Sequence, residues 1–161
     1  MMERIASSLK VAAVAVFVAA LGLTTPASPA ETSSVTVDAI VVEPLSPAPS
    51  TLCKLKVRLK NRGTQAASYF AFSVTIDGQD VPTYKAHSYA IDVDAGATGD
   101  LDLNSFWSPV TAKPFDVKVA LTEAQTVRVT KDGNVVTTTP VAPLVGLPVS
   151  ATLSVKMSPA K

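Results

Sequence analysis

Cysteine and histidine are almost absent from this chain. Its 161 residues contain one of each, Cys53 and His87. A single cysteine cannot form an internal disulfide, so packing has to stabilise the fold. Cys53 alternates with Leu55, Val57 and Leu59, and this alternation predicts a buried structural thiol on one face of a strand.

The scarcity of histidine removes the commonest catalytic arrangements. The chain has no Gly-x-Ser-x-Gly motif for a nucleophilic serine and no second histidine for a zinc site. We therefore expect a protein that is not an enzyme, with no catalytic residue, no cofactor and no metal.

Acidic residues spaced two apart are the remaining candidates for chemistry. The pairs are Asp92 with Asp94 and Asp100 with Asp102. Neighbours on one strand face lie about 6.5–7 Å apart, which suits acid–base glycoside hydrolysis. These residues alternate with Val93 and Leu101, however, as on a solvated sheet face. The sequence from Asp92 to Gly96 also has the beginning of a calcium loop but places glycine one position early and lacks the distal glutamate.

Long hydrophobic runs are missing apart from residues 11–23. This run has 13 uncharged residues, whereas a membrane-spanning helix needs about 20. Arg4 and Lys10 precede it, and Ser28 and Ala30 fit a leader-peptidase site. These features predict a signal peptide over residues 1–30, no transmembrane anchor after cleavage, and a secreted or periplasmic protein of the bacterial cell envelope.

The rest of the chain lacks a sustained helical stripe and alternates apolar with polar residues instead. Turn signals such as Asp77-Gly78 and Asp132-Gly133 interrupt the alternation. We expect residues 31–161 to form one all-β domain, an immunoglobulin-like antiparallel sandwich of eight or nine strands. The expected strands are 35–42, 52–60, 69–76, an edge segment 81–89, 100–107, 115–121, a hairpin over 127–136, and 149–157. The nearly neutral net charge of +1 gives no bulk attraction to nucleic acid.

Two of these strands carry more specific expectations. In 100–107 the alternation places Leu101, Leu103, Ser105 and Trp107 on one side, so the indole of Trp107 is predicted to close one end of the core. In 52–60 the outward side is basic, with Lys54, Lys56, Arg58 and Lys60 in a row. This row is predicted to pair with Asp100 and Asp102 on the neighbouring strand; contact with an anionic polymer is the alternative.

Three ring-bearing residues gather in the edge segment, Tyr84, His87 and Tyr89. They are the candidate binding residues, a strip that could stack on a glycan or contact a protein. An ordinary edge strand is the alternative. In a regular strand Tyr84 would also face away from the other two.

The order of features between residues 38 and 121 resembles the bacterial cell-adhesion-related domain called CARDB, an immunoglobulin-like module. An aspartate is followed by a proline-containing linker, an alternating strand that ends in Asn-x-Gly, an aromatic strand that ends in Asp-Gly, an Ala-Gly turn and a strand that closes on tryptophan. The residues are Asp38, Pro44, Pro47, Pro49, Asn61, Gly63, Asp77, Gly78, Ala95, Gly96 and Trp107.

The resemblance implies an interaction module with no catalytic residues, whose partner is a protein or glycan of the cell envelope, as in adhesion or assembly. The family's usual C-terminal strand is missing here, and residues 122–148 look like an added hairpin. Two alternatives remain open. One is a small secreted protein that binds or degrades carbohydrate, and the other is a structural subunit of a pilus or cell surface.

Overall fold

The computed structural model describes residues 33–85 and 87–159. These residues form nine strands and one short 3-10 helix. In chain order they are β1 (Val35–Glu43), β2 (Leu52–Asn61), β3 (Ala66–Ile76), β4 (Gln79–Asp80), η1 (Pro82–Tyr84), β5 (Ser88–Tyr89), β6 (Thr98–Trp107), β7 (Phe115–Asp132), β8 (Val135–Pro143) and β9 (Val149–Val155). The predicted signal peptide, residues 1–30, lies outside the described residues.

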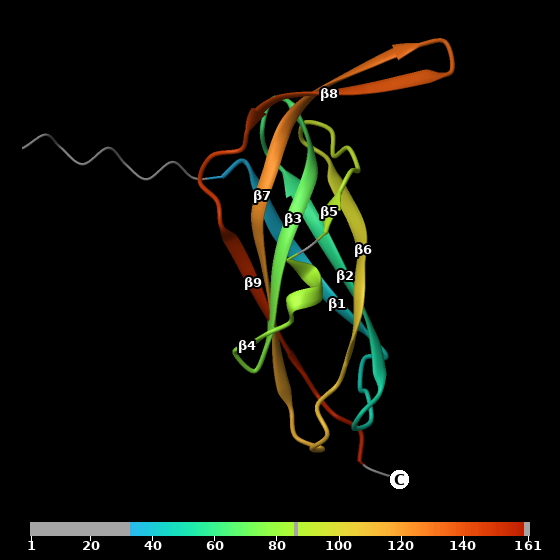
Figure 1. Ribbon diagram of the computed structural model, residues 1–161, viewed down its shortest axis with the longest axis vertical. Helices are drawn as coiled ribbons and strands as arrows, with labels where there is room; N and C mark the ends of the chain where they lie inside the picture. Colours follow the sequence, from blue (N-terminus) through green and yellow to red (C-terminus); the bar gives the residue numbers. More distant parts are fainter. Residues whose placement is uncertain (1–32, 86, 160–161) are drawn as a thin grey trace, which may run out of the picture.

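The strands form two antiparallel sheets that pack face to face (Figure 1). The smaller sheet has the order β1-β2-β6. The larger sheet has the order β4-β3-β7-β8, with β5 added to β3 and β9 added to β7. The expectation of an all-β antiparallel sandwich is confirmed, because one face of each sheet is apolar and the two faces cover each other.

The core comes from the alternating positions that the sequence indicates. Leu55, Val57 and Leu59 of β2 face Phe70 and Phe72 of β3, and all are buried. Cys53 is buried and free, as expected. Burial raises the pKa of its thiol, because the thiolate would lose its hydration, so this cysteine is a packing residue.

The placement of Trp107 in the core is wrong, and a β-bulge is the reason. Leu55 pairs with Leu103, but Cys53 pairs with Phe106, so β6 contains one residue more than β2 between these pairs. The extra residue reverses which side chains face inward. Phe106 is 4% exposed and packs edge-on against Phe115, whereas Trp107 is 67% exposed. Ser105, also expected inward, is exposed.

Further boundaries also differ from the expectation. Residues 115–132 form the single strand β7 of 18 residues. Residues 81–89 contain η1 and β5, because Pro82 begins a helical turn. The strand expected over 149–157 ends at Val155.

Both hairpin turns are confirmed. Asp77 and Gly78 have φ of 48° and 78°, and Gly133 has φ of 57°. The second hairpin projects from one end of the sandwich (Figure 1).

Within residues 33–85 and 87–159, none of the elements is a helix that is long and apolar enough to cross a bilayer.

Candidate functional site

The three residues predicted as a binding strip are separated by the structure. Tyr84 ends η1 and is fully buried, while His87 is exposed. Tyr89 on β5 is half-buried, and its ring lies edge-on against Phe72 at a centroid distance of 5.8 Å. The side chains of Tyr84, His87 and Tyr89 therefore do not form one exposed strip.

The two tyrosines instead close the edge of β6 at its bulge. The Tyr84 hydroxyl donates a hydrogen bond to the carbonyl oxygen of Asn104, and the Tyr89 hydroxyl accepts one from the Asn104 N–H at 3.3 Å. A bulged edge strand leaves backbone groups without ladder partners. The two hydroxyls form hydrogen bonds with the backbone groups of Asn104, so both tyrosines stabilise the fold.

Alkaline pH is expected to destabilise the protein through Tyr84. Burial raises the pKa of its hydroxyl above the ordinary value of 10.0, since a phenolate there would lose its hydration. The unfolded chain releases this proton above pH 10 while the folded chain keeps it. Above pH 10 the free energy of unfolding of the wild type should therefore fall by about 1.4 kcal/mol per pH unit more than that of Tyr84→Phe. Urea unfolding of both proteins from pH 7 to 11.5 measures this difference. Parallel pH profiles for the two proteins would contradict this.

Two residues of the basic row on β2, Lys56 and Arg58, pair with acidic residues, as predicted. Arg58 pairs with Asp100 through two hydrogen bonds, from Nε to Oδ1 at 2.7 Å and from Nη2 to Oδ2 at 2.9 Å. Lys56 lies opposite Asp102, with a distance of 4.0 Å from Nζ to Oδ1. Its shorter contact, 3.0 Å, is with Glu43 of β1, a partner that the sequence pattern missed. These partners leave Lys56 and Arg58 less available to an anionic polymer.

A charge-reversal cycle on Arg58 and Asp100 tests this pairing. Arg58→Glu should lower the melting temperature by a few degrees, because it places two carboxylates opposite each other. Adding Asp100→Arg should restore much of the loss. The hydrogen bonds from Arg58 hold the pKa of Asp100 below its ordinary value, so the stabilisation is present at neutral pH and is lost as pH falls through the folded pKa. An unchanged melting temperature of Arg58→Glu, with no increase on adding Asp100→Arg, would contradict the pairing.

The acidic pairs do not belong to a metal-binding cluster in the described part of the chain. Asp92 accepts a hydrogen bond from Thr138 at 2.6 Å, and Asp100 is held by Arg58. No group of three or more His, Cys, Asp or Glu side chains suited to a metal ion occurs among these residues.

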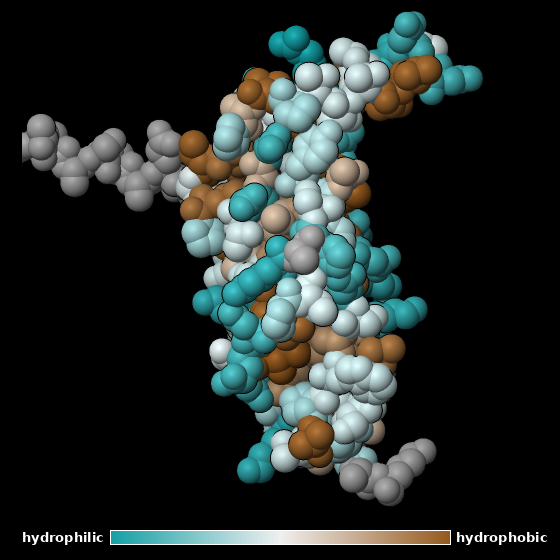
Figure 2. All heavy atoms as spheres, in the orientation of Figure 1, coloured by the Kyte–Doolittle hydropathy of each residue, from teal (hydrophilic) through white to brown (hydrophobic). Residues whose placement is uncertain are grey.

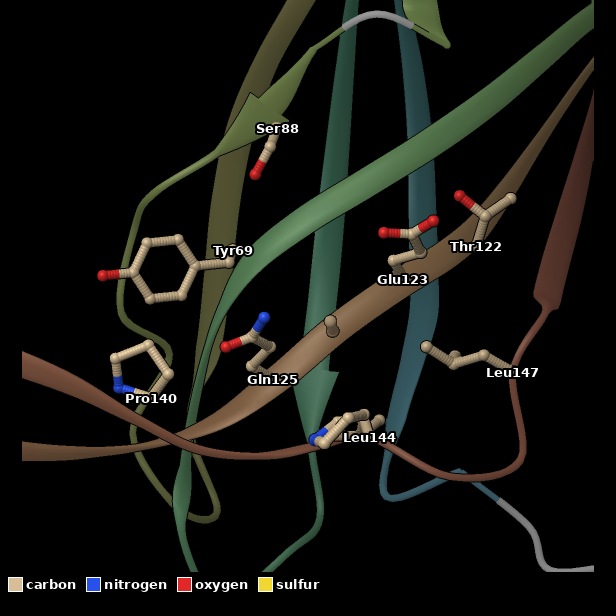
Figure 3. A pocket seen from close by; sticks show the side chains of 10 residues that line it. Tyr69, Ser88, Thr122, Glu123, Gln125, Pro140, Leu144 and Leu147 are labelled. Atoms are coloured by element: carbon tan, nitrogen blue, oxygen red, sulfur yellow. The ribbon is translucent and has the colours of Figure 1, made fainter.

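A groove on the larger sheet, lined by both polar and apolar side chains, is the best candidate site. It has a volume of about 630 Å³ and is lined by residues of β3, β5, β7, β8 and the connection to β9, within the size range of small-ligand sites. In Figure 3, Gln125 lies between Tyr69 and Glu123, and Pro140 and Leu144 border the lower side. The N–H of Leu144 bonds to the carbonyl oxygen of Ala124 at 2.8 Å, which holds this border against β7.

The groove opens where the ladder between β3 and β7 is irregular. Ser68 pairs with Gln125 and Ala71 with Glu123, so two residues of β3 lie opposite one residue of β7. Tyr69 occupies this bulge with φ of 57°. A tyrosine with positive φ inside a strand is an outlier that costs about 1–3 kcal/mol and is typical of functional sites.

Three polar side chains in the groove have no partner in the described part of the chain. Within the described residues, no hydrogen bond or ion pair is made by the side chains of Tyr69, Glu123 or Gln125. Two hydroxyls, from Ser88 and Thr122, also line the groove, and the Thr122 hydroxyl already donates to the carbonyl oxygen of Ala71 at 3.1 Å. The groove thus offers donors, acceptors, one carboxylate and one aromatic ring to a ligand.

A second hollow of about 380 Å³ continues the groove and shares Ser88, Thr122 and Glu123 with it. His87 lines this second hollow, together with Lys85, which is paired with Asp80 at 2.6 Å. His87 is thus the one residue of the predicted strip that borders the groove. Tyr69 was missed as a site residue, although its parity relative to Phe70 and Phe72 already indicates an outward ring.

A comparison with models of protein families finds no match to the chain, and a search of curated proteins finds no significant similarity.

Proposed function

We propose that this chain is an exported, non-catalytic, immunoglobulin-like module of the CARDB type, which acts in the cell envelope or outside the cell. It holds a protein or a glycan in the groove beside Tyr69. The observation that carries the proposal is the strained backbone of Tyr69 at the wall of a groove where the side chains of Tyr69, Glu123 and Gln125 make no hydrogen bond or ion pair within the described part of the chain. Strain of this kind persists when the surrounding structure enforces it, and it serves to present a side chain.

The mixed lining of polar and apolar side chains supports binding of a ligand that presents both hydrogen-bonding groups and apolar surface. Hydroxyl, amide and carboxylate groups line the wall together with one aromatic ring. Sugar chains and extended peptides both present alternating donors, acceptors and apolar surfaces. A small secreted carbohydrate-binding protein is therefore the second candidate, favoured by the same lining.

Tyr69→Asn separates a binding role from a structural one. Asparagine tolerates positive φ better than tyrosine, so the variant should melt at or above the wild-type temperature. It should also lose the aromatic contact. Immobilised wild-type protein is expected to retain a component of the native envelope, or a class of sugars on a glycan array, that Tyr69→Asn does not retain.

Trp107→Ala is the matched control, since it removes an exposed ring from the opposite sheet. It should retain the same component as the wild type. Retention that depends on Trp107 and not on Tyr69 would overturn the groove as the site. Sugar turnover that disappears in Asp92→Asn or Asp102→Asn would instead support the carbohydrate-degrading alternative.

A further inference from the structure

The hairpin of β7 and β8 continues past its last pair with β3 as a two-stranded arm, residues 128–139, whose base contacts the sandwich through the hydrogen bond from Thr138 to Asp92 at 2.6 Å. The last pair between β3 and β7 joins Ala66 to Val127, and from Arg128 onward β7 pairs only with β8. Figure 1 shows the arm projecting at the top of the molecule. A two-stranded ribbon is marginally stable in water on its own, so an arm of this kind gains stability from a further strand.

The two free edges of the arm differ in how well they are protected against pairing with a further strand. The β7 edge carries Arg128, Lys131 and Asp132, and charges on an edge discourage strand addition. The β8 edge, residues 135–139, has the sequence Val-Val-Thr-Thr-Thr and no charge. Val135 and Val136 are 63% and 57% exposed, and Figure 2 shows hydrophobic surface on the projecting arm. Every residue of this edge is β-branched, which favours strand pairing.

The backbone of β8 presents hydrogen-bonding groups outward at two positions. Asp132 and Val135 flank a two-residue turn, so they form a hydrogen-bonded pair, and the pattern alternates from there. The N–H and C=O groups of Val136 and Thr138 therefore point away from β7. The next outward position is Pro140, which has no N–H and ends the ladder.

We infer that the β8 edge pairs antiparallel with the β8 edge of a second copy of this chain, about a two-fold axis at Thr137. Val136 of each copy then exchanges its backbone hydrogen bonds with Thr138 of the other, and Val135 lies opposite Thr139. The two Thr137 residues face each other as a non-hydrogen-bonded pair, where Cα atoms approach to about 4.5 Å. The strand is complementary to itself in this register, since no like charges meet and threonine pairs are favourable across strands.

Sedimentation velocity of the purified protein over a range of concentrations tests this dimer. The wild type should show a dimer whose fraction rises with concentration. Thr137→Lys and Thr137→Glu should each be monomeric at every concentration, because like charges then meet at the axis. An equimolar mixture of the two variants should restore the dimer, which a folding defect could not do.

Thr130→Lys is the matched control, because Thr130 pairs with Thr137 within the arm and lies one strand away from the proposed interface. It should dimerise as the wild type does. Val136→Pro should be monomeric with an unchanged circular dichroism spectrum, since it removes an outward N–H from an edge strand.

A wild type that is monomeric at all concentrations overturns the inference. So does a dimer that survives Thr137→Lys, or one abolished by Thr130→Lys and not by Thr137→Lys. In a monomeric wild type, a strand from a different protein remains as the occupant of the edge.

Discussion

Phe106→Ala is expected to lower the free energy of unfolding by about 3–5 kcal/mol, whereas Trp107→Ala should change it by about 0.5 kcal/mol or less. Phe106 is 4% exposed and packs on Phe115, while its neighbour is 67% exposed on the outer face of the smaller sheet. Urea unfolding of the two variants measures the difference. The expectation reverses the one from strand alternation, which places Trp107 in the core.

Fluorescence gives an independent check, since Trp107 is the one tryptophan of the chain. Its emission in the native protein should already resemble that of a solvated indole, and acrylamide should quench it in both the native and the unfolded state. A blue-shifted, protected native emission, or a large loss of stability in Trp107→Ala, would show that the bulge in β6 is absent.

Asn61→Ala is expected to lower the free energy of unfolding by about 3 kcal/mol, because it removes three hydrogen bonds that contribute about 1 kcal/mol each. Asn61 is fully buried at the end of β2. Its Nδ2 donates to the carbonyl oxygens of Gln65 and Val93, both at 2.9 Å, and its Oδ1 accepts from the N–H of Gly63 at 2.9 Å. The side chain thus ties the β2–β3 turn to the segment that precedes β6.

Thermal and urea unfolding of Asn61→Ala measure this cost, with Asn104→Ala as the control. The side chain of Asn104 makes no hydrogen bond within the described residues; only its backbone does. Asn61→Asp should be at least as damaging as Asn61→Ala at neutral pH, since a carboxylate would face two carbonyl oxygens. Near-native stability of Asn61→Asp would contradict the assigned hydrogen bonds.

The hydrogen bonds of Asn61 also account for part of the pattern that resembles CARDB. The Asn-x-Gly sequence needs the amide for the turn and a small residue at Gly63, where an added Cβ would lie 3.1 Å from both Asn61 and Ser34. The pattern thus has a structural reason, while membership of that family stays a proposal.

The pairing of Arg58 with Asp100 was predicted from the neighbouring strands of the expected immunoglobulin-like sandwich. The period-two alternation alone was sufficient to predict the sandwich and the burial of Cys53. These features depend on which face of a strand a residue occupies, and alternation reports that face directly. The turns at Asp77-Gly78 and at Gly133 could also be predicted from the sequence, because positive φ restricts the residue types that can occupy them.

The tertiary structure alone determined the exposure of Trp107, the burial of Tyr84 and the groove beside Tyr69. The exposure of Trp107 and the groove depend on bulges in β6 and β3, where one strand contains a residue more than its partner. The burial of Tyr84 depends on the helical turn η1. A bulge has no strong composition signal, because it arises from how two distant strands match in length and twist. Since the side-chain period of a strand is two, one inserted residue reverses every later assignment on that strand. The sequence therefore specified the layers and most of the core, and the pairing of strands far apart in the chain specified which side chains reach the surface.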